Sequence, residues 1–134
     1  MPGRYGLGQG HNGRQRKVFF MESCLLVLLQ RKPGYGYSLM DELKEFSFEP
    51  DSLDISVLYR ALKELEGLGL VRSSWDEQSS LGPKRRIYSL TDQGSQVLAR
   101  WIESLSHRRV EIEKLEKAYY ANQQKNIQNN EKGH

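Results

Sequence analysis

Two groups of side chains have the types and spacing that contact with nucleic acid requires. The first combines hydroxyl and basic groups at helical spacing: Ser56, Tyr59, Arg60 and Lys63. The second is a run of three cations beside a Gly-Pro turn: Lys84, Arg85 and Arg86. Short polar side chains on a helix can reach base edges, and clustered cations bind phosphates or enter the minor groove. We therefore expect the first group to read base edges of double-stranded DNA and the second to contact its backbone.

Two tyrosines add phenol groups to this candidate surface. The hydroxyls of Tyr37 and Tyr59 can donate hydrogen bonds to phosphates, or the rings can be partly buried with only the hydroxyl in water. In an alternating strand Arg85 and Arg86 face opposite sides, so one of these two cations can serve the fold instead.

The distribution of charge favours a nucleic-acid partner more than the net charge does. The formal net charge is only +3, but two stretches, residues 1–20 and 79–86, carry cations and no acid, whereas residues 41–66 hold eight acids against three bases. Separated basic clusters suit phosphate contacts, although solvated surface charge gives the same pattern. Residues 1–16 form a Gly-rich basic tail that either follows DNA into the minor groove or only solubilises the chain.

The sequence offers little for catalysis, metal binding or membrane insertion. The histidines lie far apart, at His11, His107 and His134, and no phosphate loop, nucleophile triad or metal-ligand spacing occurs. The single cysteine, Cys24, excludes an internal disulfide framework and a cysteine-based zinc site. The longest apolar run, residues 18–29, is shorter than the about 20 residues of a spanning helix. We expect a soluble cytoplasmic protein that is not an enzyme and holds no cofactor or metal.

Three helices can position the first group of side chains. A buried helix is expected over Val18–Gln30 and an amphipathic helix over Gly36–Phe46. The third helix starts near Ser52–Asp54, where Ser or Asp can cap it, and stops at Gly67 and Gly69. Its buried stripe is expected to consist of Ile55, Leu58, Leu62 and Leu65.

Two strands and a long helix complete the chain. Residues 70–75 and 86–90 predict a β-hairpin whose loop carries the basic run. Thr91 can cap the final helix. Its apolar residues follow a heptad pattern: Leu98, Trp101, Leu105, Ile112, Leu115 and Tyr119. Because such a helix outruns a small domain, we expect this apolar seam to pack on a second copy as a homodimer, the alternative being a helix folded back on its own core.

This order of elements is typical of a winged helix-turn-helix, in which the third helix enters the major groove and the hairpin is the wing. We therefore expect a mainly α fold with a small β-hairpin. Its parts would be a DNA-binding domain over residues 17–91, a dimerisation helix over 92–123 and a polar tail over 124–134.

Three stretches resemble the PadR family of bacterial and archaeal transcriptional regulators, particularly its shorter members with one C-terminal helix. Gly36-Tyr37-Ser38-Leu39 resembles the opening of the family's second helix. The stretch 58–66, followed by Gly69-Leu70-Val71, resembles its recognition helix and exit. The stretch 82–91, with Gly94, resembles its wing and the start of its last helix. Ser38 and Val57 thereby join the expected DNA-binding surface, with Val57 standing where the family often has Ser or Thr.

The resemblance implies a homodimer that binds a palindromic operator, usually as a repressor released by a small effector. It also implies that the first helix, with Leu25 and Leu28, packs with the final helix in the dimer interface. Some members hold flat aromatic effectors between aromatic side chains of the two copies, and Trp101 could serve in this way instead of in the core. The alternative function is a protein-interaction module that uses the long helix and does not bind DNA sequence-specifically.

Overall fold

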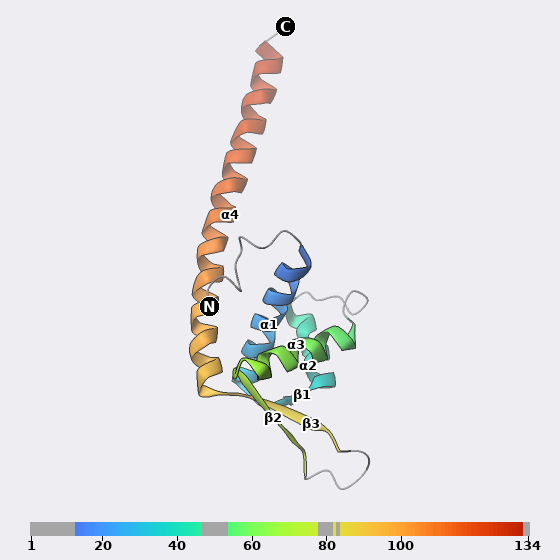
Figure 1. The fold of residues 1–134 in the computed structure, drawn as a ribbon. Coiled ribbons are helices and arrows are strands. Elements are labelled where there is room, and N and C mark those ends of the chain that lie inside the picture. Colours follow the sequence, from blue (N-terminus) through green and yellow to red (C-terminus); the bar gives the residue numbers. More distant parts are fainter. Residues whose placement is uncertain (1–12, 47–53, 78–81, 83, 133–134) are drawn as a thin grey trace. The chain divides into compact units, whose positions relative to one another are not determined.

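The structure, a computed structural model, describes residues 13–46, 54–77, 82 and 84–132. It is mainly helical with a small antiparallel sheet, and the elements follow in the order α1, β1, α2, η3, α3, β2, β3, α4 (Figure 1). The chain divides into two compact units, Met1–Ala99 and Arg100–His134. The first unit has the winged helix-turn-helix architecture that the sequence predicts.

Helix α1 (Gly13–Arg31) supplies the largest share of the core of this unit. Its apolar run is shielded from solvent almost completely at Met21, Leu25, Leu26, Leu28 and Leu29. The helix begins five residues before the predicted start, because good helix formers such as Gln, Arg and Lys precede Val18. The last four residues of the expected tail are therefore helical, while residues 1–12 lie outside the described residues. Burial raises the pKa of the Cys24 thiol to about 11, as expected for a small core side chain.

Helices α2 (Gly36–Glu42) and α3 (Ile55–Gly67) pack against α1 and each other, with a 3₁₀ turn, η3 (Leu43–Phe46), at the end of α2. The buried stripe of α3 is Leu58, Ala61, Leu62 and Leu65. Each buried leucine stabilises the fold by about 1.5–3 kcal/mol relative to exposure. The prediction for Ile55 was wrong, because this first helical residue is 40% exposed.

Three strands form the sheet, in the order β1–β3–β2. Strands β2 (Val71–Trp75) and β3 (Arg86–Leu90) pair antiparallel with Ser73 opposite Tyr88, as the predicted hairpin requires. Strand β1 (Gly34–Tyr35) pairs with the other edge of β3 and was not predicted. Two residues are too few for an alternation signal, so only the tertiary pairing reveals this strand. It attaches the start of α2 directly to the wing.

The start of the last helix is locked to the turn after α3. The hydroxyl of Thr91 accepts a hydrogen bond from the backbone N–H of Gly94 at 2.9 Å and lies 2.7 Å from the carbonyl oxygen of Gly69. A Cβ added at Gly94 would lie 2.1 Å from the Leu70 carbonyl oxygen. Only glycine permits this approach of two backbones, which explains why Thr91 and Gly94 occur at this spacing.

Helix α4 runs from Asp92 to Lys132 over 41 residues. It starts where Thr91 predicts, but it continues nine residues beyond Gln123. The expected polar tail over 124–134 is therefore helical through Lys132, which corrects the prediction. The Gln, Lys and Glu residues of this segment are good helix formers, and extending an existing helix does not require a new nucleus.

Candidate nucleic-acid interface

One face of α3 presents the polar residues that the sequence singles out. Ser56, Tyr59, Arg60 and Lys63 are all exposed, with Tyr59 at 43%. At about 100° per residue they share an arc on the side opposite to the buried leucines. Val57, by contrast, is partly buried and carries no hydroxyl. The structure therefore brings four of the five expected α3 side chains together on one solvent-facing stripe.

The N-terminus of α3 is capped within the chain. The Asp54 carboxylate accepts a hydrogen bond from the Ser56 backbone N–H at 3.0 Å. This bond, with the Ser56 hydroxyl and the nearby Arg60 cation, lowers the pKa of Asp54 below its ordinary value. The carboxylate thus stays charged at neutral pH, where it fixes the end of α3 that carries Ser56.

Gly36 holds α2 close to the exposed face of α3. A Cβ at this position would lie 2.5 Å from the Tyr59 ring and its hydroxyl oxygen. The Tyr59 ring therefore packs on the start of α2, while 43% of the side chain remains in solvent. This packing requires a glycine at position 36, and a contact of the Tyr59 hydroxyl with phosphate stays a prediction.

Ser38 serves the start of α2 rather than projecting into solvent. Its hydroxyl accepts from the Tyr35 backbone N–H at 3.2 Å and donates to the Tyr35 carbonyl oxygen at 3.0 Å. The side chain is half-buried. The structure thus gives Ser38 a capping role, which differs from the direct DNA contact that the sequence predicts.

The wing and α2 meet in a cluster of two tyrosines, one arginine and one aspartate. Arg85 donates a hydrogen bond through Nη1 to the Tyr37 hydroxyl oxygen at 2.5 Å. Its guanidinium carbon lies 5.3 Å from the centre of the Tyr37 ring and 5.7 Å from that of Tyr35. The two rings are stacked, with their centres 5.7 Å apart and 15° between their planes. Tyr35 in turn donates to the Asp76 carboxylate, and this bond is the largest cause of the raised pKa of Tyr35.

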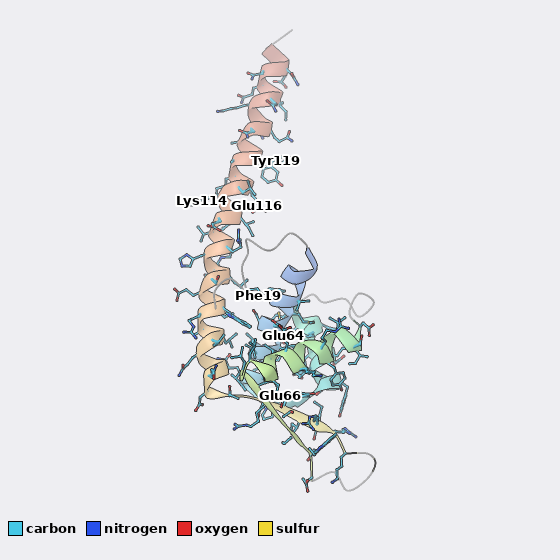
Figure 2. All side chains as sticks on the ribbon, in the orientation of Figure 1. Phe19, Glu64, Glu66, Lys114, Glu116 and Tyr119 are labelled. Carbon is cyan, nitrogen blue, oxygen red and sulfur yellow. The ribbon has the colours of Figure 1, made fainter. Side chains whose placement is uncertain are left out.

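Arg86 makes a different set of contacts on the other face of the hairpin. Its Nε donates to the Ser73 hydroxyl at 3.0 Å, and its guanidinium lies 4.7 Å from the centre of the Trp75 ring. The Ser73 hydroxyl donates to the Glu66 carboxylate of α3 at 2.8 Å, and Figure 2 shows Glu66 on α3 near the strands. This chain of contacts ties the wing to the end of α3. Lys84 is exposed beside the turn.

The sequence reasoning missed Tyr35, Asp76, Ser73 and Glu66. A signal for Tyr35 does exist in the repeated Gly-Tyr pattern of residues 34–37, which places two aromatic rings two residues apart at a helix start. Asp76 and Glu66 carry no such signal, because their partners are 41 and 7 residues away and are brought close only by the fold.

The residues expected at a dimer interface fall into two classes of exposure. Leu25, Leu28, Leu98 and Trp101 are 0%, 1%, 3% and 6% exposed in the single chain, and Leu105 is partly buried. Ile112, Leu115 and Tyr119 are 47%, 70% and 54% exposed. Figure 2 shows the side chains of α4 projecting around the helix, Tyr119 among them. Leu25 and Leu28 therefore contribute to the core of one chain, and their place in an interface stays a prediction.

No cluster of three or more metal-ligating side chains occurs among the described residues. In the same residues, no helix combines the length and the apolar character needed to cross a membrane.

Comparisons with known proteins agree with this geometry. A family model described as "Transcriptional regulator PadR-like family" matches residues 25–100. The match covers the winged helix-turn-helix from the middle of α1 to the first turns of α4. A comparison with curated proteins gives no match.

Solved structures of similar fold include regulators of transcription. A conserved protein described as a potential transcriptional factor is 34% identical, with a TM-score of 0.66, over 78% of this chain and 91% of its own. A PadR-like transcription factor from Bacteroides fragilis is 25% identical, with a TM-score of 0.65, over 77% of this chain and 96% of its own. PadR from Bacillus subtilis, solved in complex with operator DNA, is 27% identical, with a TM-score of 0.54, over 62% of this chain and 46% of its own.

Proposed function

The chain belongs to the PadR-like family of transcriptional regulators, and we propose that it acts as a homodimer on a palindromic DNA operator. The observation that carries this proposal is the exposed polar stripe of α3, with Ser56, Tyr59, Arg60 and Lys63 on one side of a helix whose other side is core. The complex of Bacillus subtilis PadR with operator DNA supports the same use of the fold here.

In this proposal α3 enters the major groove and the wing contacts the flanking backbone. Arg60 is the side chain on the stripe best suited to a guanine edge, because its planar guanidinium can donate two parallel hydrogen bonds. Ser56 and Lys63 lie one turn to either side and suit phosphates or neighbouring bases. The capped N-terminus of α3 holds these side chains in a fixed orientation before DNA arrives.

The test is a comparison of two arginine variants on two duplexes. One duplex is selected from a random-sequence pool by the wild-type protein, and the other is its scrambled version. Arg60→Ala should weaken binding of the selected duplex by about 1–3 kcal/mol and relax the preference at one position in each half-site. The control is Arg100→Ala, which removes the same charge from an exposed position on α4 and should leave the preference unchanged.

Two outcomes would contradict the proposal at different levels. An equal loss for Arg60→Ala on both duplexes would make Arg60 a phosphate contact and not a base reader. A wild-type protein that binds both duplexes equally would favour the alternative function, a protein-interaction module, for which the exposed apolar residues of α4 offer a surface.

Repression and release by a small effector complete the proposal. The family supports both, and Trp101 is the residue through which we expect a flat aromatic effector to act. Trp101 is 6% exposed in the single chain, so a ligand that stacks on its ring should change its fluorescence. Titration of aromatic compounds into the wild type and into Trp75→Phe, which leaves Trp101 as the sole tryptophan, tests this step. An effector that releases DNA without changing Trp101 emission would remove Trp101 from the mechanism.

A further inference from the structure

We propose that Arg85 and Tyr37 form a single preassembled clamp for one phosphate of the DNA backbone, with Arg85 orienting the Tyr37 hydroxyl. This inference rests on the proposed function and refines it, because it separates a backbone-binding device at the wing from the base-reading face of α3. It also assigns different roles to two adjacent arginines that have the same charge, one just before strand β3 and one at its first residue.

The hydrogen bond between the two side chains determines where the Tyr37 proton points. Arg85 donates through Nη1 to the Tyr37 oxygen at 2.5 Å. A phenol oxygen that accepts from a cation keeps its own proton free to donate. Because the Tyr37 side chain is 54% exposed, this O–H is available to an acceptor from solvent. The remaining N–H groups of the Arg85 fork can donate to the same acceptor.

Two further residues, Tyr35 and Asp76, hold the clamp in place. The Tyr35 ring stacks on that of Tyr37, and the Tyr35 hydroxyl donates to Asp76. The backbone N–H of Asp76 donates to the Arg85 carbonyl oxygen at 2.7 Å. Tyr35 therefore binds one oxygen of the Asp76 carboxylate. The Arg85 guanidinium is hydrogen-bonded to the neutral Tyr37 phenol, and this bond leaves the positive charge of Arg85 in place.

A phosphodiester oxygen suits this arrangement better than a base edge does. Two donors, one of them charged, converge from two elements, and together they match an anionic acceptor. Arg86 provides the contrast, since its Nε is bonded to Ser73 and its guanidinium is stacked on Trp75. Removing Arg86 should disturb the packing of the wing, whereas removing Arg85 should delete a phosphate contact and leave Tyr37 without its orienting partner.

The experiment is a double-mutant cycle on duplexes that each lack one phosphate charge. A neutral methylphosphonate linkage is placed in turn at every position of the selected duplex, and binding is measured for the wild type, Tyr37→Phe, Arg85→Ala and the double variant. Each single variant should lose affinity about ten-fold, the loss typical of one hydrogen bond to a charged group. The double variant should lose little more than Arg85→Ala alone, because both side chains act on one phosphate.

The methylphosphonate positions identify that phosphate. One linkage in each half-site should weaken the wild type and have no further effect on Arg85→Ala. Arg85→Ala should also reduce the slope of log K against log salt by about 0.9 per half-site on both duplexes. Arg85→Lys should keep the wild-type slope of log K against log salt, because the positive charge remains. It should lose the non-additivity with Tyr37→Phe, because the lysine does not orient the Tyr37 hydroxyl. A merely structural role for Arg85 would not separate these two effects. Thermal unfolding of each variant checks that the wing remains folded, with Arg86→Ala as the comparison that should lower the Tm because it disturbs the packing of the wing.

Several results would overturn the clamp. Multiplicative losses in the double variant would show that Tyr37 and Arg85 act independently, and a changed base preference in Arg85→Ala would make it a groove reader. An unchanged salt slope would remove Arg85 from the backbone contacts, and displacement of both duplexes by inorganic phosphate at constant ionic strength would show a site for free anions. These failures leave the wild-type preference for the selected duplex intact, whereas failure of the proposed function abolishes that preference.

Discussion

Two leucines in helices of this chain have opposite environments. Leu62 of α3 is 0% exposed, whereas Leu115 of α4 is 70% exposed. Both residues are good helix formers in amphipathic patterns, so the local sequence does not distinguish them. The difference lies in what surrounds them. In the first unit α1, α2 and the sheet pack around α3, whereas beyond residue 99 one helix is the only element that the structure describes.

Three apolar side chains of the distal helix nevertheless share one side, whereas Val110 lies on the opposite one. Ile112 and Tyr119 occupy the same heptad position, and Leu115 occupies the other position of the seam. Ile127, beyond the predicted end of the helix and 51% exposed, lies outside this seam, about 120° around the helix from Leu115. A series of large apolar residues in water marks an interaction site. The first unit therefore buries its apolar core within one chain, whereas the seam of the distal helix is left exposed, as our proposal of a homodimer requires.

The largest expected effect comes from placing a charge in this seam. Leu115→Asp removes the burial of one leucine from each copy, about 1.5–3 kcal/mol per protomer, so the dissociation constant of the homodimer should rise at least 100-fold. Val110→Asp is the matched control. Val110 is 43% exposed and lies about 200° around the helix from Ile112. Sedimentation equilibrium at micromolar concentration should give a monomer for the first variant and a dimer for the control.

A monomeric wild type, or equal dissociation of both variants, would contradict the dimer seam. The first result would return α4 to the alternative of packing on its own chain. The second would mean that the partner covers a different side of the helix.

A smaller effect is expected from the core of the first unit. Leu62→Ala should lower the free energy of unfolding by about 2–5 kcal/mol, because a completely buried leucine leaves a cavity. Leu115→Ala makes the same chemical change at an exposed position, so its effect on stability should depend on protein concentration and that of Leu62→Ala should not. Urea denaturation at two protein concentrations measures both effects. If the two leucines behave alike, the contrast between the two regions does not hold.

Much of the first unit could be predicted because its signals are local. The stripe of α3 and the alternation of Arg86–Leu90 each follow from a period in the sequence, and strand β3 has the predicted bounds. The same stripe also predicts the exposed face of α3, because the residues opposite to the buried leucines must face solvent. The capping roles of Asp54 and Thr91 were predictable because residue type and position coincide.

What the sequence could not provide depends on distant partners. Strand β1 exists through pairing with β3, and the contact between Tyr35 and Asp76 joins residues 41 positions apart. Ser38 has the residue type of a DNA contact, but its hydroxyl is used by the backbone of Tyr35. Residues 124–132 are helical although their polar composition predicts a frayed end, because Gln, Lys and Glu favour continuation of the helix.

The smallest expected effect concerns the cap that orients α3. Asp54→Ala removes the acceptor of the Ser56 N–H and should lower the Tm by a few degrees at pH 7, because one helix-terminal donor loses its partner. Asp54→Asn keeps an acceptor and removes the charge, so its Tm should lie between those of the wild type and the Ala variant. Thermal unfolding of all three proteins between pH 7 and pH 3 separates the hydrogen bond from the charge.

The pH dependence follows from the direction of the Asp54 pKa shift. Folding lowers the pKa of Asp54 below its ordinary value of 3.8, first through the bond from the Ser56 backbone and also through the nearby Arg60 cation. The charged cap therefore contributes stability above pH 3.8, and this contribution is lost as the pH falls through the lower value of the folded state. The difference in Tm between the wild type and Asp54→Asn should be constant from pH 7 to about pH 5 and shrink toward pH 3. If the difference instead stays constant to pH 3, the Asp54 charge does not stabilise α3, and the order of its exposed face rests on the packing of its leucines alone.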